Sequence, residues 1–177
     1  MKKIIINVSG KDRIGIISDI TKEISQLNGN IETSKMIKLG QEFNMLMLVT
    51  IDDYGLNDLK EKLSFYKDLS VSLKTTKQNI DENNKNKFTF ILKGSDNEGI
   101  VHSCTNIFHN FKINVIDLET KLLNAPITGS PLFHIKAIIY ISNLNSLEKF
   151  KGEITSLEND NNVVVKLIQN DEGDTNH

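Results

Sequence analysis

The spacing of apolar and polar residues divides the first 76 residues into alternating strands and helices. Strands are predicted over 3–9, 31–39, 42–51 and 69–75. The first strand is β-branched and ends at Gly10, and Gly40-Gln41 forms a hairpin turn between the second and the third. The third strand carries apolar side chains on both faces, which favours a position inside the sheet.

Two amphipathic helices are predicted between these strands. Their apolar stripes are Ile16, Ile17, Ile20, Ile24 and Leu27 in the first helix, and Leu56, Leu59 and Leu63 in the second. Asn28-Gly29 provides a C-terminal cap for the first helix. The order strand, helix, strand, strand, helix, strand predicts an α+β fold of the ferredoxin-like βαββαβ type. Both helices then cover one face of an antiparallel sheet.

The pattern occurs twice. Residues 10–31 reappear 84 positions later, as residues 94–115. Identical pairs at this offset are Gly10/Gly94, Asp12/Asp96, Gly15/Gly99, Ile16/Ile100, Thr21/Thr105 and Asn30/Asn114. The duplication predicts two modules, residues 1–76 and 88–169, joined by a polar linker at 77–87 and followed by a polar tail at 170–177. Modules of about 75–85 residues have modest cores and gain from packing on a partner.

The second module repeats the order of elements with one asymmetry. Its strands are predicted to start at Phe88 and to cover 113–122, 132–141 and 163–168. Its helical stripes are Ile100, Cys104, Phe108 and Phe111, then Leu147, Phe150, Ile154 and Leu157. Residues 124–131 replace the short hairpin turn of the first module and contain both prolines of the chain. The prolines stiffen this loop, which is a partner contact, a lid or a plain connector.

Composition and charge exclude several classes of protein. The 177 residues are 38% hydrophobic and 25% charged, which is typical of a soluble globular protein. The net charge of −2 disfavours direct binding to nucleic acid. The N-terminal apolar run stops after three residues, and no stretch approaches a membrane span, so a cytoplasmic protein is expected. Cys104 is the only cysteine and excludes an intrachain disulfide.

The repeated segment after each first strand has the chemistry of an amino-acid site. A helix N-terminus favours an anion such as a carboxylate. Gly15 and Gly99, just before the helices, let a ligand approach the backbone closely. An ammonium group would pair with Asp12 or Asp96, and the amide of Asn30 or Asn114 both donates and accepts hydrogen bonds. Together these groups would suit a free amino acid.

A purely structural interpretation of the same residues is also open. Asp12 and Asp96 would then cap their helices, and the two glycines would only ease the turn. The repetition does not decide between the interpretations, because a duplication copies helix caps as faithfully as ligand contacts.

The run Gly10-Lys-Asp-Arg-Ile-Gly-Ile-Ile-Ser-Asp-Ile, followed by Asn28-Gly-Asn-Ile-Glu, resembles an ACT domain. That family has Asp-Arg-Pro-Gly-Ile/Val, a helix and then Asn-Ile at this place. Ala125-Pro-Ile-Thr-Gly-Ser-Pro-Leu-Phe133 resembles the corresponding stretch of tandem-ACT proteins of the glycine cleavage system transcriptional repressor type. The resemblance covers about residues 3–169 and leaves no catalytic domain, which implies a regulatory protein without enzymatic activity or cofactor.

ACT modules bind small effectors, commonly amino acids, near the loop between the first strand and the first helix. The resemblance therefore implies a ligand-binding loop in each module. These loops comprise Asp12, Arg13, Ile14, Gly15 and Ile16 with Asn30, and Asp96, Asn97, Glu98, Gly99 and Ile100 with Asn114. Ile14 replaces the proline of the family, and Glu98 adds a negative charge that weakens carboxylate binding. The loop of the first module is therefore favoured.

The remaining reactive residues carry no recognisable signature. Cys104 lies on a helical apolar stripe and is expected in the core. His102, His109, His134 and His177 lack metal-ligand spacing, so no metal site is predicted.

The sequence thus predicts a non-catalytic, amino-acid-sensing regulator. Its ligand is glycine or a similar amino acid, and its partner is a protein such as a DNA-binding regulator, with neither nucleic acid nor membrane bound directly. A homodimer is expected, since ACT modules pair through sheet edges or helices. The alternatives are a regulatory subunit that gives feedback control of an amino-acid biosynthetic enzyme, and a ligand-free dimerisation scaffold.

Overall fold

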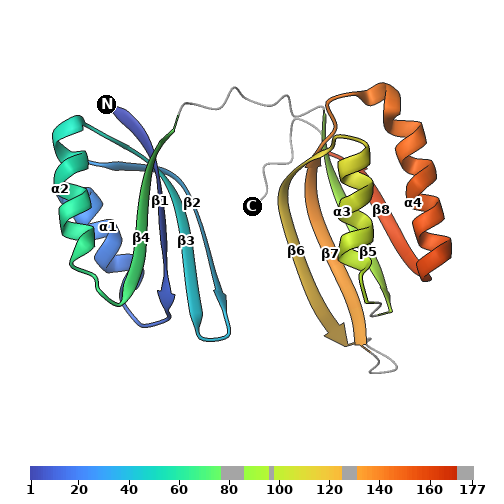
Figure 1. The fold of residues 1–177 in the computed structure, drawn as a ribbon, viewed down its shortest axis with the longest axis horizontal. Coiled ribbons are helices and arrows are strands. Elements are labelled where there is room, and N and C mark those ends of the chain that lie inside the picture. The colour runs from blue at the N-terminus through green and yellow to red at the C-terminus, as the bar shows by residue number, and fades with distance from the viewer. Residues whose placement is uncertain (77–85, 96–97, 125–130, 171–177) are drawn as a thin grey trace. The chain divides into compact units, whose positions relative to one another are not determined.

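The structure is a computed structural model that describes residues 1–76, 86–95, 98–124 and 131–170. The chain divides into two compact units, Met1–Asn79 and Ile80–His177, which are described separately (Figure 1). Most of the predicted linker (77–85), the central part of the proline-containing loop (125–130) and the tail from residue 171 lie outside the described residues.

The first unit has the predicted βαββαβ order. Its elements are β1 (Lys2–Lys11), α1 (Ile16–Gln26), β2 (Asn30–Leu39), β3 (Glu42–Ile51), α2 (Asp53–Ser64) and β4 (Leu69–Thr76). The strands form one antiparallel sheet in the order β2-β3-β1-β4. The interior position expected for the third strand is confirmed, since β3 lies between β2 and β1.

The second unit repeats this architecture. Its elements are β5 (Lys87–Ser95), α3 (Ile100–Asn110), β6 (Asn114–Asn124), β7 (Pro131–Tyr140), the short 3-10 helix η2 (Leu144–Ser146), α4 (Leu147–Asn161) and β8 (Val163–Gln169). The sheet order β6-β7-β5-β8 matches that of the first unit strand for strand. β5 begins at Lys87, so this last residue of the predicted linker is already part of the sheet. The ferredoxin-like fold is confirmed in both units.

Each sheet buries one face beneath its two helices (Figure 1). In the first unit, alternate residues of β1 and β3 pack against α1 and α2, as the period-two pattern of these strands requires. The second unit has an aromatic core in which the rings of Phe90 and Phe108 meet edge to face, with centroids 5.1 Å apart. Cys104 is buried in that core, as predicted. None of the helices in the described part of the chain is long and apolar enough to cross a membrane.

The first strand of each module has a glycine as its last residue but one, where the last strand lies very close to it. Gly94 pairs with Val163 of β8, and a Cβ on Gly94 would lie 2.5 Å from Val163 Cγ1 and 2.9 Å from its Cα. Gly10 has the same place beside Leu69 of β4, where a Cβ would lie 2.8 Å from the carbonyl oxygen of Asp68. A side chain at either position would push the two strands apart.

We therefore expect Gly94→Ala to destabilise the second module by about 1–3 kcal/mol, the usual range for overpacking a close contact. Urea unfolding followed by far-UV circular dichroism measures this change. Gly152→Ala is the matched control, because Gly152 lies inside α4 with open space around its Cα. The control should gain roughly 0.5–1 kcal/mol from helix propensity. Equal effects of the two substitutions would contradict the steric explanation.

Candidate functional site

The segment between β1 and α1 turns sharply at Gly15, which immediately precedes the helix. Gly15 has a φ of +94° and Gly99 in the second module has a φ of +82°, both in the left-handed region that favours glycine. Space is open at both positions, since the nearest atom to a Cβ on Gly15 would be 3.9 Å away and none lies within 4 Å at Gly99. The backbone conformation, rather than crowding, requires glycine here. Ile16 and Ile100 open the two helices, as predicted.

Asp12 does not cap α1, so the capping interpretation is wrong for this residue. No side chain makes a capping hydrogen bond at the Gly15 helix start. The Asp12 carboxylate instead pairs with Lys38 of β2, with 2.5 Å between Oδ2 and Nζ. The Asp12 N–H donates to the Gln41 carbonyl oxygen at 2.8 Å. Asp96, its counterpart in the second module, lies outside the described residues.

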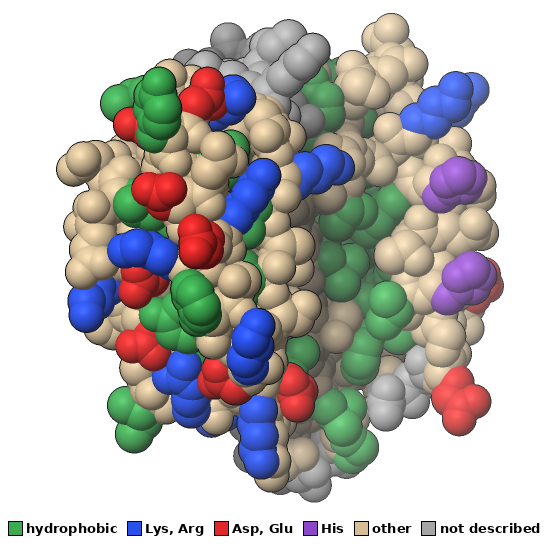
Figure 2. Space-filling model, turned by 60° about the vertical axis from the view of Figure 1, so that its left-hand side comes forward, with side chains coloured by type: hydrophobic (Ala, Val, Ile, Leu, Met, Phe, Trp, Pro, Cys, Tyr) green, Lys and Arg blue, Asp and Glu red, His purple; other side chains and the backbone are tan. Residues whose placement is uncertain are grey.

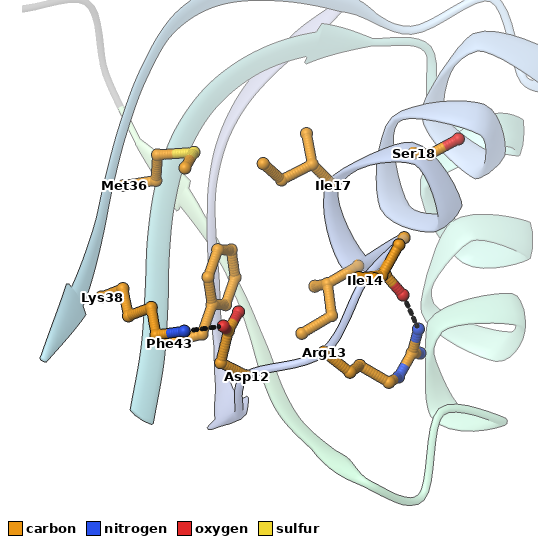
Figure 3. A pocket seen from close by; sticks show the side chains of 10 residues that line it. Asp12, Arg13, Ile14, Ile17, Ser18, Met36, Lys38 and Phe43 are labelled. Carbon is orange, nitrogen blue, oxygen red and sulfur yellow. Dashed lines mark hydrogen bonds and ion pairs between the residues drawn. The ribbon is translucent and has the colours of Figure 1, made fainter. Parts of the chain in front are cut away.

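Arg13 ties the loop to two other parts of the first module. Its Nε donates to Asp68 Oδ2 at 2.7 Å, and its Nη1 donates to Asp19 Oδ2 at 2.9 Å. Nη1 also lies 3.4 Å from the Ile14 carbonyl oxygen (Figure 3). The two carboxylates raise the pKa of the Arg13 guanidinium, with Asp68 the larger cause, and Arg13 in turn lowers the pKa of Asp68. Arg13 therefore fixes the loop in place.

A cavity of about 450 Å³ opens between this loop, the start of α1 and the ends of β2 and β3. It is lined by Asp12, Arg13, Ile14, Gly15, Ile16, Ile17, Ser18, Met36, Lys38 and Phe43. Figure 3 shows Met36 and Phe43 on the sheet side, Ile14 and Ile17 on the helix side, and the Asp12–Lys38 pair at one end. The structure thus brings together the five loop residues expected from the sequence, and adds Ile17 and Ser18 of α1 and Met36, Lys38 and Phe43 of the sheet.

Asn30 is not in this cavity. It begins β2, as expected, but lies beyond the far end of α1 in a second hollow of about 530 Å³. That hollow is lined by Ser18, Thr21, Lys22, Ile24, Ser25, Gly29, Asn30 and Ile31. Ser18 lines both hollows, so the two are neighbours along α1. The structure separates the amide of Asn30 from Asp12.

The second module keeps the backbone frame of this site but replaces several of its charged residues. Gly99, Ile100 and Asn114 occupy the same places as Gly15, Ile16 and Asn30. Leu122 takes the place of Lys38, because Leu122 pairs with Phe133 in the second sheet as Lys38 pairs with Phe43 in the first. Asn162 likewise takes the place of Asp68, because each lies just before the last strand of its module. Asp19 and Arg13 correspond in sequence to Ser103 and to Asn97, the latter outside the described residues.

Other reactive groups do not form a site. Burial raises the pKa of the Cys104 thiol to about 11, so the thiol stays protonated at neutral pH and is a poor nucleophile. Partial burial lowers the pKa of His134, and nearby Lys93 adds to this effect. Within the described ranges, no group of three or more His, Cys, Asp or Glu side chains could hold a metal ion. On the face seen in Figure 2, basic and acidic side chains are interspersed.

Comparison with known proteins agrees with this description. The ACT-domain family model matches residues 2–76. A glycine cleavage system transcriptional repressor of Escherichia coli is 24% identical over 97% of this chain and 94% of its own length. A UPF0237 protein of Methanococcus maripaludis is 32% identical over 45% of this chain and 92% of its own length.

A solved structure extends the likeness of fold over both modules. An uncharacterised protein of Galdieria sulphuraria superposes with a TM-score of 0.85 at 23% identity. The match covers 96% of this chain and 99% of the other.

Because Arg13 contacts Asp68, removal of the Arg13 guanidinium should change the titration of the Asp68 carboxyl. In Arg13→Gln, the pKa of Asp68 should rise toward its ordinary value of 3.8, because the cation that stabilises the carboxylate is gone. Carboxyl ¹³C NMR measures the titration of Asp68 in the wild-type protein and in the variant. Glu32 is the internal control, since contacts with Lys3 and Thr50 lower its pKa independently of Arg13.

The pair also predicts an acid dependence of stability. Because the pKa of Asp68 is lower in the folded state, its stabilisation is complete above the unfolded pKa and is lost as pH falls through the folded one. Arg13→Gln should weaken this dependence below about pH 4. An unchanged titration of Asp68 in the variant would contradict the assignment of the contact.

Proposed function

The first module belongs to the ACT-domain family, and from this premise we propose that the chain is a regulatory protein without catalytic activity. In this proposal the first module binds a free amino acid in the cavity beside Gly15. Binding then alters the contact of the chain with a protein partner.

The observation that carries the proposal is the Asp12–Lys38 pair at the edge of that cavity. A free amino acid is a zwitterion and needs one cation and one anion within a few ångströms of each other. Lys38 Nζ and Asp12 Oδ2 offer these charges 2.5 Å apart. A zwitterion inserted between them would replace one ion pair by two charge-assisted interactions.

The start of α1 supports the same orientation of the ligand. The first N–H groups of a helix have no acceptor within the helix, and they carry the positive end of its dipole. Gly15 turns the chain so that this end borders the cavity. The ligand carboxylate would therefore lie between α1 and Lys38, with its ammonium group toward Asp12.

We propose a single site in each chain, in the first module. The second module has Leu122 in place of Lys38, so the cation that would bind the carboxylate is missing. The loop of the second module also contains Glu98, whose negative charge would repel the ligand carboxylate. The second module would then contribute to the partner contact, or to a homodimer, rather than to sensing.

The action through a partner is proposed from the E. coli relative, which is a transcriptional repressor. The present chain has a net charge of −2, which suits contact with a DNA-binding protein better than contact with DNA itself. Regulation requires that the amino acid bind two states of the complex with different affinity.

A thermal-shift panel of the twenty amino acids tests the proposal. A ligand at about 100 times its dissociation constant should add roughly 2.7 kcal/mol of stability, which raises the melting temperature by several degrees. Lys38→Gln should abolish the shift, because it removes the only cation proposed for the ligand carboxylate.

Lys35→Gln is the matched control, with the same change of charge on the same strand. Lys35 pairs with Leu46 and Lys38 with Phe43, so the two lysines lie on opposite faces of the sheet. The control should keep the full shift. No shift with any amino acid at millimolar concentration would overturn the proposed function and favour the scaffold alternative.

A further inference from the structure

The walls of the cavity beside the Asp12–Lys38 pair indicate which amino acid it takes. We propose that the site selects an amino acid with a large apolar side chain, of leucine size, over glycine. This inference rests on the proposed function, that is, on the binding of a free amino acid at this place.

Four apolar side chains from four segments converge on the cavity: Ile14 from the loop, Ile17 from α1, Met36 from β2 and Phe43 from β3 (Figure 3). Phe43 is buried and forms the floor. The side chains of Ile14, Ile17 and Met36 are 101%, 41% and 54% exposed, so their apolar surface is available to a ligand. Exposed apolar side chains grouped around one cavity mark a place for an apolar ligand group.

The guanidinium of Arg13, which also lines the cavity, is held away from this wall. Arg13 is bound to Asp19 and Asp68, and Figure 3 shows its guanidinium on the side of Ile14 remote from Met36 and Phe43. The Asp12–Lys38 pair lies at one end of the cavity, next to Phe43, and Ile17 and Met36 lie farther from the pair (Figure 3). An α-amino acid has the same division, with charges at one end and a side chain at the other.

The size of the cavity favours a ligand larger than glycine. A volume of about 450 Å³ lies within the range of small-molecule sites, and glycine has no side chain to occupy the apolar part. Each methylene moved from water into such a site improves affinity roughly fourfold. The four side-chain carbons of leucine should therefore give at least tenfold tighter binding than glycine, even if they are only half buried.

A polar side chain of the same size should bind poorly. Asparagine has nearly the shape of leucine, but its amide would lose water against Ile17, Met36 and Phe43. These side chains offer no N–H or O–H group in return, and an unpaired amide is costly to bury. Comparison of leucine with asparagine thus separates apolar selection from a selection by size alone.

Isothermal titration calorimetry with L-leucine, L-asparagine and glycine on the full chain tests the inference. We expect the dissociation constant of leucine to be at least tenfold lower than that of either of the other two. Equal affinities for leucine and glycine would overturn the apolar selection and leave the proposed function intact. Absence of binding by all three, together with a flat thermal-shift panel, would overturn both.

A pair of variants then locates the selection in this cavity. Met36→Gln keeps the size of the side chain and makes this wall polar, so it should weaken leucine binding at least fivefold and leave glycine binding unchanged. Ile37→Gln is the matched control, because Ile37 is adjacent on β2, similarly exposed and on the opposite face of the sheet. Equal losses in the two variants, or unchanged leucine binding in Met36→Gln, would overturn the assignment.

Discussion

Burial of one face of each four-stranded sheet beneath two helices is the constraint on which the rest of this structure depends. In the first module Ile4, Ile6 and Val8 of β1 must meet α1, so the chain has to reverse direction between Lys11 and Ile16. Gly15 adopts a left-handed conformation within this short reversal, immediately before α1. The start of α1 is thereby fixed beside the ends of β2 and β3, and the cavity between them follows from that placement.

The two modules show how one frame can be kept while its chemistry changes. Gly94 and Gly99 preserve the close strand contact and the turn of Gly10 and Gly15, because the backbone cannot be built in this way with larger residues. The charged side chains face solvent and are under no such constraint. Lys38 and Asp68 of the first module are accordingly matched by Leu122 and Asn162 in the second. A repeated backbone motif is thus weak evidence for a repeated binding site.

Almost all of the fold could be predicted from the sequence, since its signals are local. The apolar spacing along α1 and the β-branched run of β1 each depend on residues within one element, and the predicted stripe from Ile16 to Leu27 matches α1 to within a residue. The duplication made each module a check on the other. The exact start of β5 at Lys87 was missed, because a lysine on the solvent face of a strand resembles the polar linker before it.

The candidate site was predictable only in part. Asp12 to Ile16 form a continuous segment, and their presence at the start of a helix follows from sequence alone. The pairing of Asp12 with Lys38 depends on the register of β2 with β3, and that of Arg13 with Asp68 depends on the contact of β4 with β1. Asn30 was grouped with the loop by its recurrence, yet the length of α1 carries it into a neighbouring hollow.

The sequence by itself thus determined the two βαββαβ modules and the loop that precedes each first helix. The reason is that hydrophobic periodicity and glycine turns act over a few residues. The tertiary structure alone decided which charges meet at that loop and which apolar side chains surround the cavity. Met36, Lys38 and Phe43 reach it from two strands and lie 20, 22 and 27 residues after Ile16 in sequence. Such contacts depend on strand order and register, which the periodicity of a single element does not specify.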